Sequence, residues 1–357
     1  MSLLLSTKEL TEALTLRDLS AGPHALGLVV AAISDAMRNA YPTTEIREIR
    51  AHPLVPVEDN YEKLGYPPDA VTRDARYTRY ASETTMLRSH TTAMIPPALR
   101  ALPRNPDVVL LCPGLVYRRD VVDRIHTGTP HQLDLWRITT GPVSSADLDD
   151  LIATVVHAAL PGAEYRTVPA SHPYTDAGRQ VDVLVDGEWL EVAECGLAAR
   201  PVLAGAGLSD DVHGLAMGLG LDRLVMLRKG ISDIRLLRAT DPRIASQLLD
   251  LTEYRSVSRH PPISRDVSIA VEADADAEIL GGIVRDAIGS AVDAVEEILV
   301  LSETSLEALP AAAIARLGIK PGQKNVLLRV VLRHPSRTLS DQEANALRDQ
   351  IHAALTS

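Results

Sequence analysis

Phenylalanine is absent from this sequence of 357 residues. Ordinary amino-acid usage would supply on the order of a dozen in a chain of this length. Tyrosine, leucine and methionine must therefore fill the volumes that phenylalanine usually takes in a protein core. Chance, a compositional bias and a functional reason all explain the absence, and composition alone does not separate them.

Cysteine and long apolar runs are also scarce. Two cysteines, Cys112 and Cys195, are too few for a disulfide framework or a four-ligand zinc site, so the sequence leaves any metal unknown. No apolar run reaches the roughly 18 residues of a membrane span. The first twenty residues have no basic region and carry Glu9, Glu12 and Asp18, which argues against a targeting segment. We expect a cytoplasmic protein with no membrane partner.

Chain length and net charge further limit the number of domains and the class of protein. The chain is too long for one small domain, and a hydrophobic fraction of 46% allows sizeable cores. The pattern of apolar residues changes near residue 250, which predicts one domain over 1–250 and a second over 251–357. A net charge of −11 argues against non-specific adhesion to nucleic acid, but it does not exclude a local basic patch.

Before residue 250 the periodicity predicts an α+β arrangement. An apolar helix over 23–40 ends before Pro42, and residues 59–69 are turn-rich, which is typical of a surface loop. The other expected elements are a strand over 45–55, a strand, polar loop and helix over 84–102, an antiparallel pair over 107–120 and 131–141, a capped helix over 144–160, a hairpin over 180–196 that turns at Asp186-Gly187, and a strand followed by a helix over 213–237.

After residue 250 the order of elements is strand, helix, strand, strand, helix. The expected ranges are 266–273, 277–292, 295–303, 325–334 and 340–355. Ser340 and Glu343 form a capping box at the start of the last helix. This order predicts an α/β sandwich.

Residues 114–134, GLVYRRDVVDRIHTGTPHQLD, gather charged side chains at the tip of the first predicted hairpin. Arg118 and Arg119 would point to opposite faces, and either guanidinium offers a planar donor pair to a phosphate. Asp120 and Asp123 suit an amine, a metal or an arginine, and His126 suits a terminal phosphate. A solvated hairpin held by salt bridges is the alternative.

Two further segments offer ligand-binding groups. In GLGLDR, Gly218 and Gly220 allow a ligand close to the backbone, and Arg223 lies at a helix N-terminus, where the dipole favours anions. In RSHTTA, His90 and Thr92 are polar groups that are also typical of turns. The order of the three segments is more informative than each segment alone.

Together these segments resemble the catalytic core of phenylalanyl-tRNA synthetase, a class II aminoacyl-tRNA synthetase, in its single-chain organellar form. YRRDVVDRIHTGTPHQLD resembles motif 2 of that family and GLAMGLGLDRLVMLRKGISDIRLL resembles motif 3. LRSHTT and WLEVAECGL resemble the family's LRTHTS and WLEVLGCGM. The resemblance implies a class II antiparallel sheet flanked by helices, followed by a ferredoxin-like anticodon-binding domain (FDX-ACB).

The resemblance also implies ATP and Mg²⁺ as cofactors and assigns roles to the residues. Two candidate catalytic arginines would hold ATP, Arg118 at the α-phosphate and Arg223 at the γ-phosphate. Asp120 would lie near the adenine and the amine, His126 near the triphosphate, and Gly218 and Gly220 would line the ATP site. The residues implied to bind the amino acid are His90, Thr92, Gln132, Asp134, His172, Tyr174, Glu194 and Ala216.

The chain departs from the family where the amino-acid side chain would bind. His172 and Tyr174, in ASHPYTDAG, replace the two phenylalanines of the family's YFPFTEPS. Asp134 is shorter than the family's glutamate, and Glu194 replaces the first glycine of its GCG. Glu194 either faces away and pairs with an arginine, or faces inward and favours a polar or cationic substrate. A synthetase without phenylalanine could also be translated when charged tRNA for phenylalanine is scarce; compositional drift is the alternative.

The second domain is implied to bind tRNA, although it is acidic. From residue 255 to the end it holds eleven Lys and Arg against fourteen Asp and Glu, a net charge of −3. RNA contact therefore requires a local basic face. The candidates are Arg255, Arg259, Arg265, Lys324, Arg329, Arg333 and Arg337. The alternative is that they pair with the acidic residues.

The leading hypothesis is ATP-dependent activation of phenylalanine, or of a related amino acid, and its transfer to tRNA. Two alternatives stay open: a synthetase-derived enzyme with a non-tRNA acceptor, and a non-catalytic RNA-binding paralogue. The helix over 23–40 resembles the dimer-forming motif 1 of class II enzymes, whereas single-chain relatives are monomers. The sequence therefore allows both a monomer and a homodimer.

Overall fold

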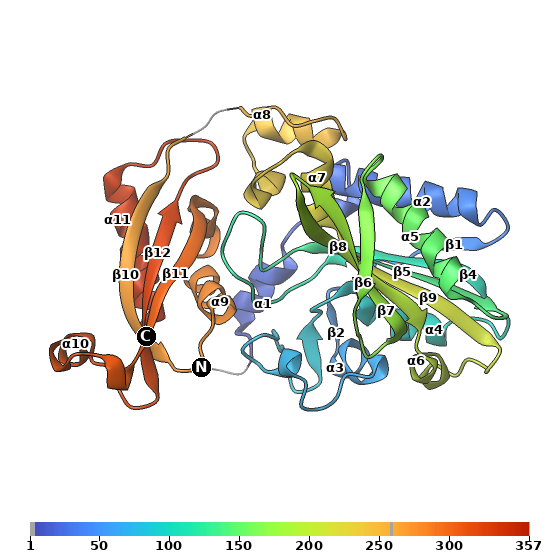
Figure 1. Cartoon of the computed structure of the whole chain (residues 1–357), viewed down its shortest axis with the longest axis horizontal. Coiled ribbons are helices and arrows are strands. Elements are labelled where there is room, and N and C mark those ends of the chain that lie inside the picture. Colours follow the sequence, from blue (N-terminus) through green and yellow to red (C-terminus); the bar gives the residue numbers. More distant parts are fainter. Residues whose placement is uncertain (1–3, 258–259, 357) are drawn as a thin grey trace. The chain divides into compact units, whose positions relative to one another are not determined.

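The computed structural model describes residues 4–257 and 260–356 (Figure 1). These residues form two compact units. The first comprises the chain up to Arg118, Thr129–Ile231 and Leu248–Glu253. The second comprises Arg119–Gly128, Ser232–Gln247 and the chain from Tyr254 onward, so it includes two segments that precede residue 250.

The first unit contains a seven-stranded sheet in the order β1-β4-β5-β9-β8-β7-β6. Among the strands that the structure describes, β1 with β4 is its only parallel pair, so the expected antiparallel sheet is confirmed. The strands are β1 Glu45–Glu48, β4 Asp107–Leu115, β5 His131–Thr140, β6 Tyr165–Pro169, β7 Thr175–Val185, β8 Glu188–Ala198 and β9 Val212–Gly220.

Helices lie on both faces of this sheet (Figure 1). Buried residues of α4 and α6 pack in one core cluster with Leu110, Trp136 and Ala216. On the other side α2 packs against α5 and α7. The longer helices of the unit are α1 Thr7–Leu14, α2 Ala25–Ala40, α4 Ile95–Arg100, α5 Ser145–Ala159, α6 Arg200–Gly205 and α7 Leu221–Lys229.

The predicted helices and turns of this unit are confirmed where local signals are strong. Ser144 caps α5 with a capping box that includes Asp147. Asp186 and Gly187 both have positive φ, 51° and 86°, and join β7 to β8 as a tight hairpin. These turn residues fix the register of the hairpin.

Of two expectations for residues 45–69, one is wrong and the other holds only in part. The single strand expected over 45–55 is two strands: β1 joins the large sheet, and β2 Leu54–Pro56 pairs with β3 Thr85–Leu87 in a separate two-stranded sheet. The turn-rich segment over 59–69 is a surface loop only in part. It begins inside the short helix α3 Val57–Asn60, and its Tyr61 and Leu64 are buried in the core, whereas Pro67, Pro68 and Asp69 are exposed.

The second unit contains the three-stranded sheet β10-β12-β11, antiparallel throughout. Its helices α9 and α11 pack together, and α11 packs on β10. The order strand, helix, strand, strand, helix is confirmed, with an additional helix, α10. The elements are β10 Ile263–Glu272, α9 Ala277–Ile288, β11 Val295–Ser305, α10 Ala311–Leu317, β12 Gln323–Leu332 and α11 Asp341–Leu355.

Short helices connect these elements. In the first unit, 3-10 turns lie at Leu19–Ala21, Glu62–Leu64, Val71–Arg73 and Thr91–Met94. In the second unit, the connecting turns include Ile234–Arg238, Pro242–Ala245 and Gly289–Ala294. Within the described ranges no single helix is long and apolar enough to span a membrane; one pair bent by 53°, Thr7–Ala21 with Ala25–Ala40, meets the test on length and composition alone.

Candidate active site

One face of the large sheet carries half of the residues implied to bind the amino acid, together with the two glycines implied to line the ATP site. Between β5 and β9, Gln132 pairs with Gly220, Asp134 with Gly218, and Trp136 with Ala216. Register partners on neighbouring strands project from the same face of a sheet. On β8, Glu194 is the partner of Gly218. The topology therefore brings together six of the predicted positions from three strands.

Asp134 lies at the base of this face and is almost fully buried. Its carboxylate accepts hydrogen bonds of 2.5 Å from Thr92 Oγ1 and 2.5 Å from Trp136 Nε1. Burial raises the pKa of Asp134 to about 7, against the lowering effect of these two donors. Gly218 lies next to the carboxylate, since a Cβ there would be 3.6 Å from Asp134 Oδ2.

The segment that contains Thr92 also brings His90 and Gln132 to the site. Thr91 donates its backbone N–H to Gln132 Oε1 over 3.2 Å. Burial, and to a smaller extent the positive charge of Arg118, lowers the pKa of His90 to about 4, so His90 is neutral at pH 7. Arg118 therefore lies within electrostatic range of the predicted amino-acid site.

A chain of aromatic rings surrounds the space above Asp134. Tyr66 stacks on His90 with ring centroids 5.8 Å apart, and Trp136 stacks on Tyr174 at 6.3 Å. Tyr66 and Tyr174 are also 6.3 Å apart, and His172 lies 5.5 Å from Tyr174. Tyr66 and Trp136 were not predicted. The position of Trp136 two residues after Asp134 on one strand is the signal that would have found it.

His172 and Glu194 are joined directly. His172 Nε2 lies 2.8 Å from Glu194 Oε2. The hydrogen bond with Glu194 is the main cause of the raised pKa of His172. The negative charge of Glu194 also contributes to the raised pKa of Tyr66 and of Tyr174. Glu194 thus faces the aromatic rings, and its partner is a histidine and not an arginine.

Arg223 lies in the first turn of α7, as the GLGLDR motif predicts, and donates a 2.8 Å hydrogen bond to the backbone carbonyl of Glu191. Burial and the charge of Glu194 raise the pKa of Glu191, whereas the charges of Arg223 and Arg118 lower it. One carboxylate therefore lies within electrostatic range of both predicted ATP-binding arginines. Glu191 was not among the predicted site residues.

A buried pair fixes the start of α7 against β5. Asp222 accepts a hydrogen bond from the backbone N–H of His131, and its Oδ1 lies 3.1 Å from His131 Nδ1. His131 Nε2 accepts a 3.1 Å hydrogen bond from the backbone N–H of Leu19. These bonds assign the proton of a neutral ring to Nδ1. They hold Arg223, the next residue after Asp222, at the end of the strand that carries Gln132.

The hairpin tip belongs to the second unit. Arg119 pairs with Asp286, and Arg285 donates to the backbone carbonyls of Asp120 and Val121. His126 Nδ1 lies 2.7 Å from Asp123 Oδ2, an interaction within the tip. The predicted roles of Asp120 and His126 in ATP binding stay predictions.

The residues predicted to contact tRNA hold acidic or polar partners inside the second unit. Arg265 binds Asp341, Lys324 binds Glu303, and Arg333 binds Glu296. The remaining ion pairs are Arg329 with Asp266 and Arg337 with Glu343. Arg255 donates its backbone N–H to Gln247, and Arg259 lies outside the described residues. This pairing is the alternative that the sequence left open.

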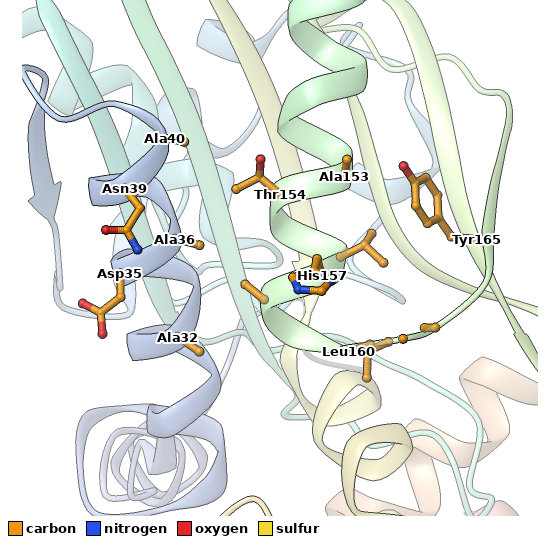
Figure 2. A pocket seen from close by; sticks show the side chains of 14 residues that line it. Ala32, Asp35, Ala36, Asn39, Ala40, Ala153, Thr154, His157, Leu160 and Tyr165 are labelled. Atoms are coloured by element: carbon orange, nitrogen blue, oxygen red, sulfur yellow. The ribbon is translucent and has the colours of Figure 1, made fainter.

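A separate groove of about 940 Å³ lies between α2 and α5 (Figure 2). Alanines of both helices line it, together with Asp35, Thr154, His157 and Tyr165. Its lining shares no residue with the predicted site.

The sheet and the residues on its face define a class II aminoacyl-tRNA synthetase core. Residues 24–248 match the family model described as tRNA synthetases class II core domain (F). The chain belongs to this family, and it is an aminoacyl-tRNA ligase, as the resemblance implied.

The relatives are phenylalanine–tRNA ligases. A chloroplastic/mitochondrial enzyme of Arabidopsis thaliana is 27% identical over 343 residues, which cover 92% of this chain and 75% of that protein. A probable mitochondrial enzyme of Drosophila melanogaster is 27% identical and covers 85% of this chain and 76% of its own length. The alpha subunit from Nostoc punctiforme is 35% identical over 190 residues, and the match spans 53% of this chain and 56% of that subunit.

The expectation of a cytoplasmic protein is wrong. Two relatives that align with 85% or more of the chain are named for chloroplasts and mitochondria, which indicates an organellar type. The argument from scarce cysteine failed because a reducing environment is not specific to one compartment.

Proposed function

We propose that this protein activates an aromatic amino acid of the phenylalanine type with ATP and transfers it to tRNA. The observation that supports this most is the position of Glu191. The positive charges of Arg118 and Arg223, which are 105 residues apart in the sequence, both lower the pKa of its carboxyl group against the raising effect of burial. Glu191 is also three residues from Glu194 in the candidate amino-acid site. A nucleotide held by both arginines would therefore adjoin the amino acid.

The amino-acid end of the site would bind the ammonium group through Asp134 and Gln132. Asp134 is the only one of the two that carries charge, and its burial strengthens its attraction to a cation. Neutral His90 does not repel the ammonium group. Gly218 leaves room for the amino acid above the carboxylate.

The nucleotide end would bind ATP through Arg118 at the α-phosphate and Arg223 at the γ-phosphate. A planar guanidinium matches the geometry of phosphate oxygens with two parallel hydrogen-bond donors. Class II synthetases use ATP with Mg²⁺, and Glu191 offers the carboxylate oxygen that Mg²⁺ takes alongside phosphate oxygens. When bound, the metal would neutralise charge on the triphosphate.

The reaction needs positioning and charge neutralisation and no protein nucleophile. One carboxylate oxygen of the amino acid attacks the α-phosphorus, the bond to the bridging oxygen breaks, and pyrophosphate leaves with the electron pair. In the second step a terminal ribose hydroxyl of tRNA, implied to be the 2′-OH, attacks the acyl carbon, loses its proton, and AMP leaves.

The second unit would contact tRNA as an anticodon-binding domain. Its basic residues hold carboxylate partners, so binding RNA would exchange those partners for phosphates. Such an exchange is favourable only where exposed ion pairs are weak, and exposed pairs contribute about 0–1 kcal/mol. The relatives' names favour tRNA as the acceptor over a small molecule.

Amino-acid-dependent exchange of pyrophosphate into ATP tests the first step, and charging of tRNA tests the second. Arg223→Ala should abolish the exchange. Arg228→Ala on the same helix is the matched control, because Arg228 donates to the backbone carbonyl of Ala159 and not toward the site. Exchange that is unchanged in Arg223→Ala would refute the assigned nucleotide site.

A further inference from the structure

The side-chain end of the amino-acid site contains an ion pair where the family resemblance implies apolar groups. The resemblance implies two phenylalanines and a glycine, and this chain has His172, Tyr174 and Glu194. The structure joins two of these replacements, His172 and Glu194, at 2.8 Å. The two residues lie on opposite sides of the turn between β7 and β8.

The pair belongs to the site and not to the outer surface. The His172 side chain is 17% exposed and its ring packs at 5.5 Å from Tyr174. The Glu194 side chain is 37% exposed, so its carboxylate stays accessible to a bound molecule. Glu194 also lies opposite Gly218, whose missing side chain leaves space above Asp134.

Avoidance of phenylalanine does not explain the pair. Replacing phenylalanine by tyrosine, as at Tyr174, keeps the ring and satisfies such a constraint. His172 does not keep an apolar ring, and Glu194 replaces a glycine that needed no substitution. Two independent changes that meet as hydrogen-bonding partners indicate selection for polarity at this position.

The net charge of the His172–Glu194 pair limits the kinds of substrate side chain that the site would bind. A lone Glu194 would attract a cationic side chain. The imidazolium of His172 neutralises it, so the pair offers a hydrogen-bond acceptor and a donor with no net charge. A neutral side chain with a hydrogen-bonding group fits these partners, and the aromatic rings of Tyr66, Tyr174 and Trp136 fit an aromatic body.

We propose, resting on the function proposed above, that the preferred substrate is an amino acid whose aromatic ring carries a hydroxyl or similar hydrogen-bonding group, recognised by Glu194 and His172. The ring would contact the aromatic cluster, and its polar group would donate to the Glu194 carboxylate. A ring without that group would leave the carboxylate without a ligand partner.

The test measures pyrophosphate exchange with phenylalanine, with tyrosine and with 3-hydroxyphenylalanine. Tyrosine and 3-hydroxyphenylalanine each add one ring hydroxyl to phenylalanine, at different positions. Lysine serves as the cationic probe. We expect kcat/KM for at least one hydroxylated amino acid to exceed that for phenylalanine by about tenfold or more. We expect the double variant His172→Phe with Glu194→Gly to lose this preference.

Single conservative substitutions distinguish a loss of substrate preference from a failure to fold. Glu194→Gln preserves the shape of the side chain and should reduce the preference for the hydroxylated ring. Glu188→Gln, at the exposed start of the same strand, should leave it unchanged. Exchange that favours phenylalanine over both hydroxylated probes would overturn this inference while the proposed function stands. Exchange with no amino acid would overturn the proposed function itself.

Discussion

Thr92 and Asp134, 42 residues apart in the chain, are joined by a buried hydrogen bond of 2.5 Å. The bond connects the 3-10 turn Thr91–Met94 to β5, an interior strand of the large sheet. It places a carboxylate with a pKa of about 7 beneath the predicted amino-acid site. The ionisation of Asp134 near neutral pH gives the first prediction.

Amino-acid binding should strengthen as pH rises through about 7. The free protein holds Asp134 protonated below this value, and a protonated carboxyl does not attract an ammonium group. The kcat/KM for the amino acid in pyrophosphate exchange reports ionisations of the free enzyme and should rise over this range.

Thr92→Ala removes a hydrogen-bond donor to the charged carboxylate of Asp134. The midpoint of this pH profile should therefore shift to higher pH. Thr154→Ala, on α5, is the control and should leave it in place. A profile that does not depend on Asp134, shown by an unchanged midpoint in Asp134→Asn, would contradict the assignment.

Trp136→Phe should destabilise the protein by about 1.5–3 kcal/mol through the lost hydrogen bond to a charged acceptor. Trp136 is fully buried, and its Nε1 donates to Asp134 over 2.5 Å. Chemical denaturation measures the difference. Trp189→Phe is the matched control, because it keeps a ring under Arg166, whose guanidinium lies 4.5 Å from the Trp189 ring. Equal stability of the two variants would show that the bond contributes nothing.

The His172–Glu194 pair should make stability depend on pH. The pKa of His172 is raised above 6.5 in the folded protein, so the pair contributes its full stability below about pH 6.5. That contribution is lost as the pH rises through the folded pKa. Unfolding measured from pH 6 to pH 9 should show a decline in the wild type that is smaller in Glu194→Gln. Parallel curves for the two proteins would mean that the pair does not form in solution.

Two glycines on the site face should respond differently to alanine. A Cβ on Gly196 would lie 2.7 Å from Thr175 Cβ and 2.9 Å from the Asp176 carbonyl oxygen, so Gly196→Ala should cost about 1–3 kcal/mol of stability. A Cβ on Gly218 would meet Asp134 Oδ2 at 3.6 Å, an ordinary contact. Gly218→Ala should therefore keep the melting temperature and weaken amino-acid binding. The reverse pattern would contradict the placement of the site.

The sequence predicted the elements that have strong local signals. The capping box of Ser340 and Glu343, the Asp186-Gly187 turn and the periodic strands all carry their signal within a few residues. The first half of the segment over 59–69 was misread because its turn residues are common in surface loops, whereas Tyr61 and Leu64 are buried by tertiary packing that local sequence does not encode.

The arrangement of the candidate site was predictable in part. The family resemblance pointed to Thr92, Gln132 and Asp134, and β-strand periodicity placed Gln132 and Asp134 on one face of β5. The partner of Glu194 was not predictable, because it depends on the pairing of β7 with β8, which is irregular between Asp176 and Arg179. A one-residue change in that register would turn Glu194 away from His172.

The most direct test of the central proposal is the affinity of the protein for ATP, measured by titration calorimetry in the presence of Mg²⁺. We predict that Arg118→Ala and Arg223→Ala each weaken ATP binding at least about tenfold, because each removes a charged contact to the same nucleotide. Arg228→Ala should bind ATP like the wild type. Unchanged affinity in either of the first two variants would contradict a single nucleotide site formed by both arginines.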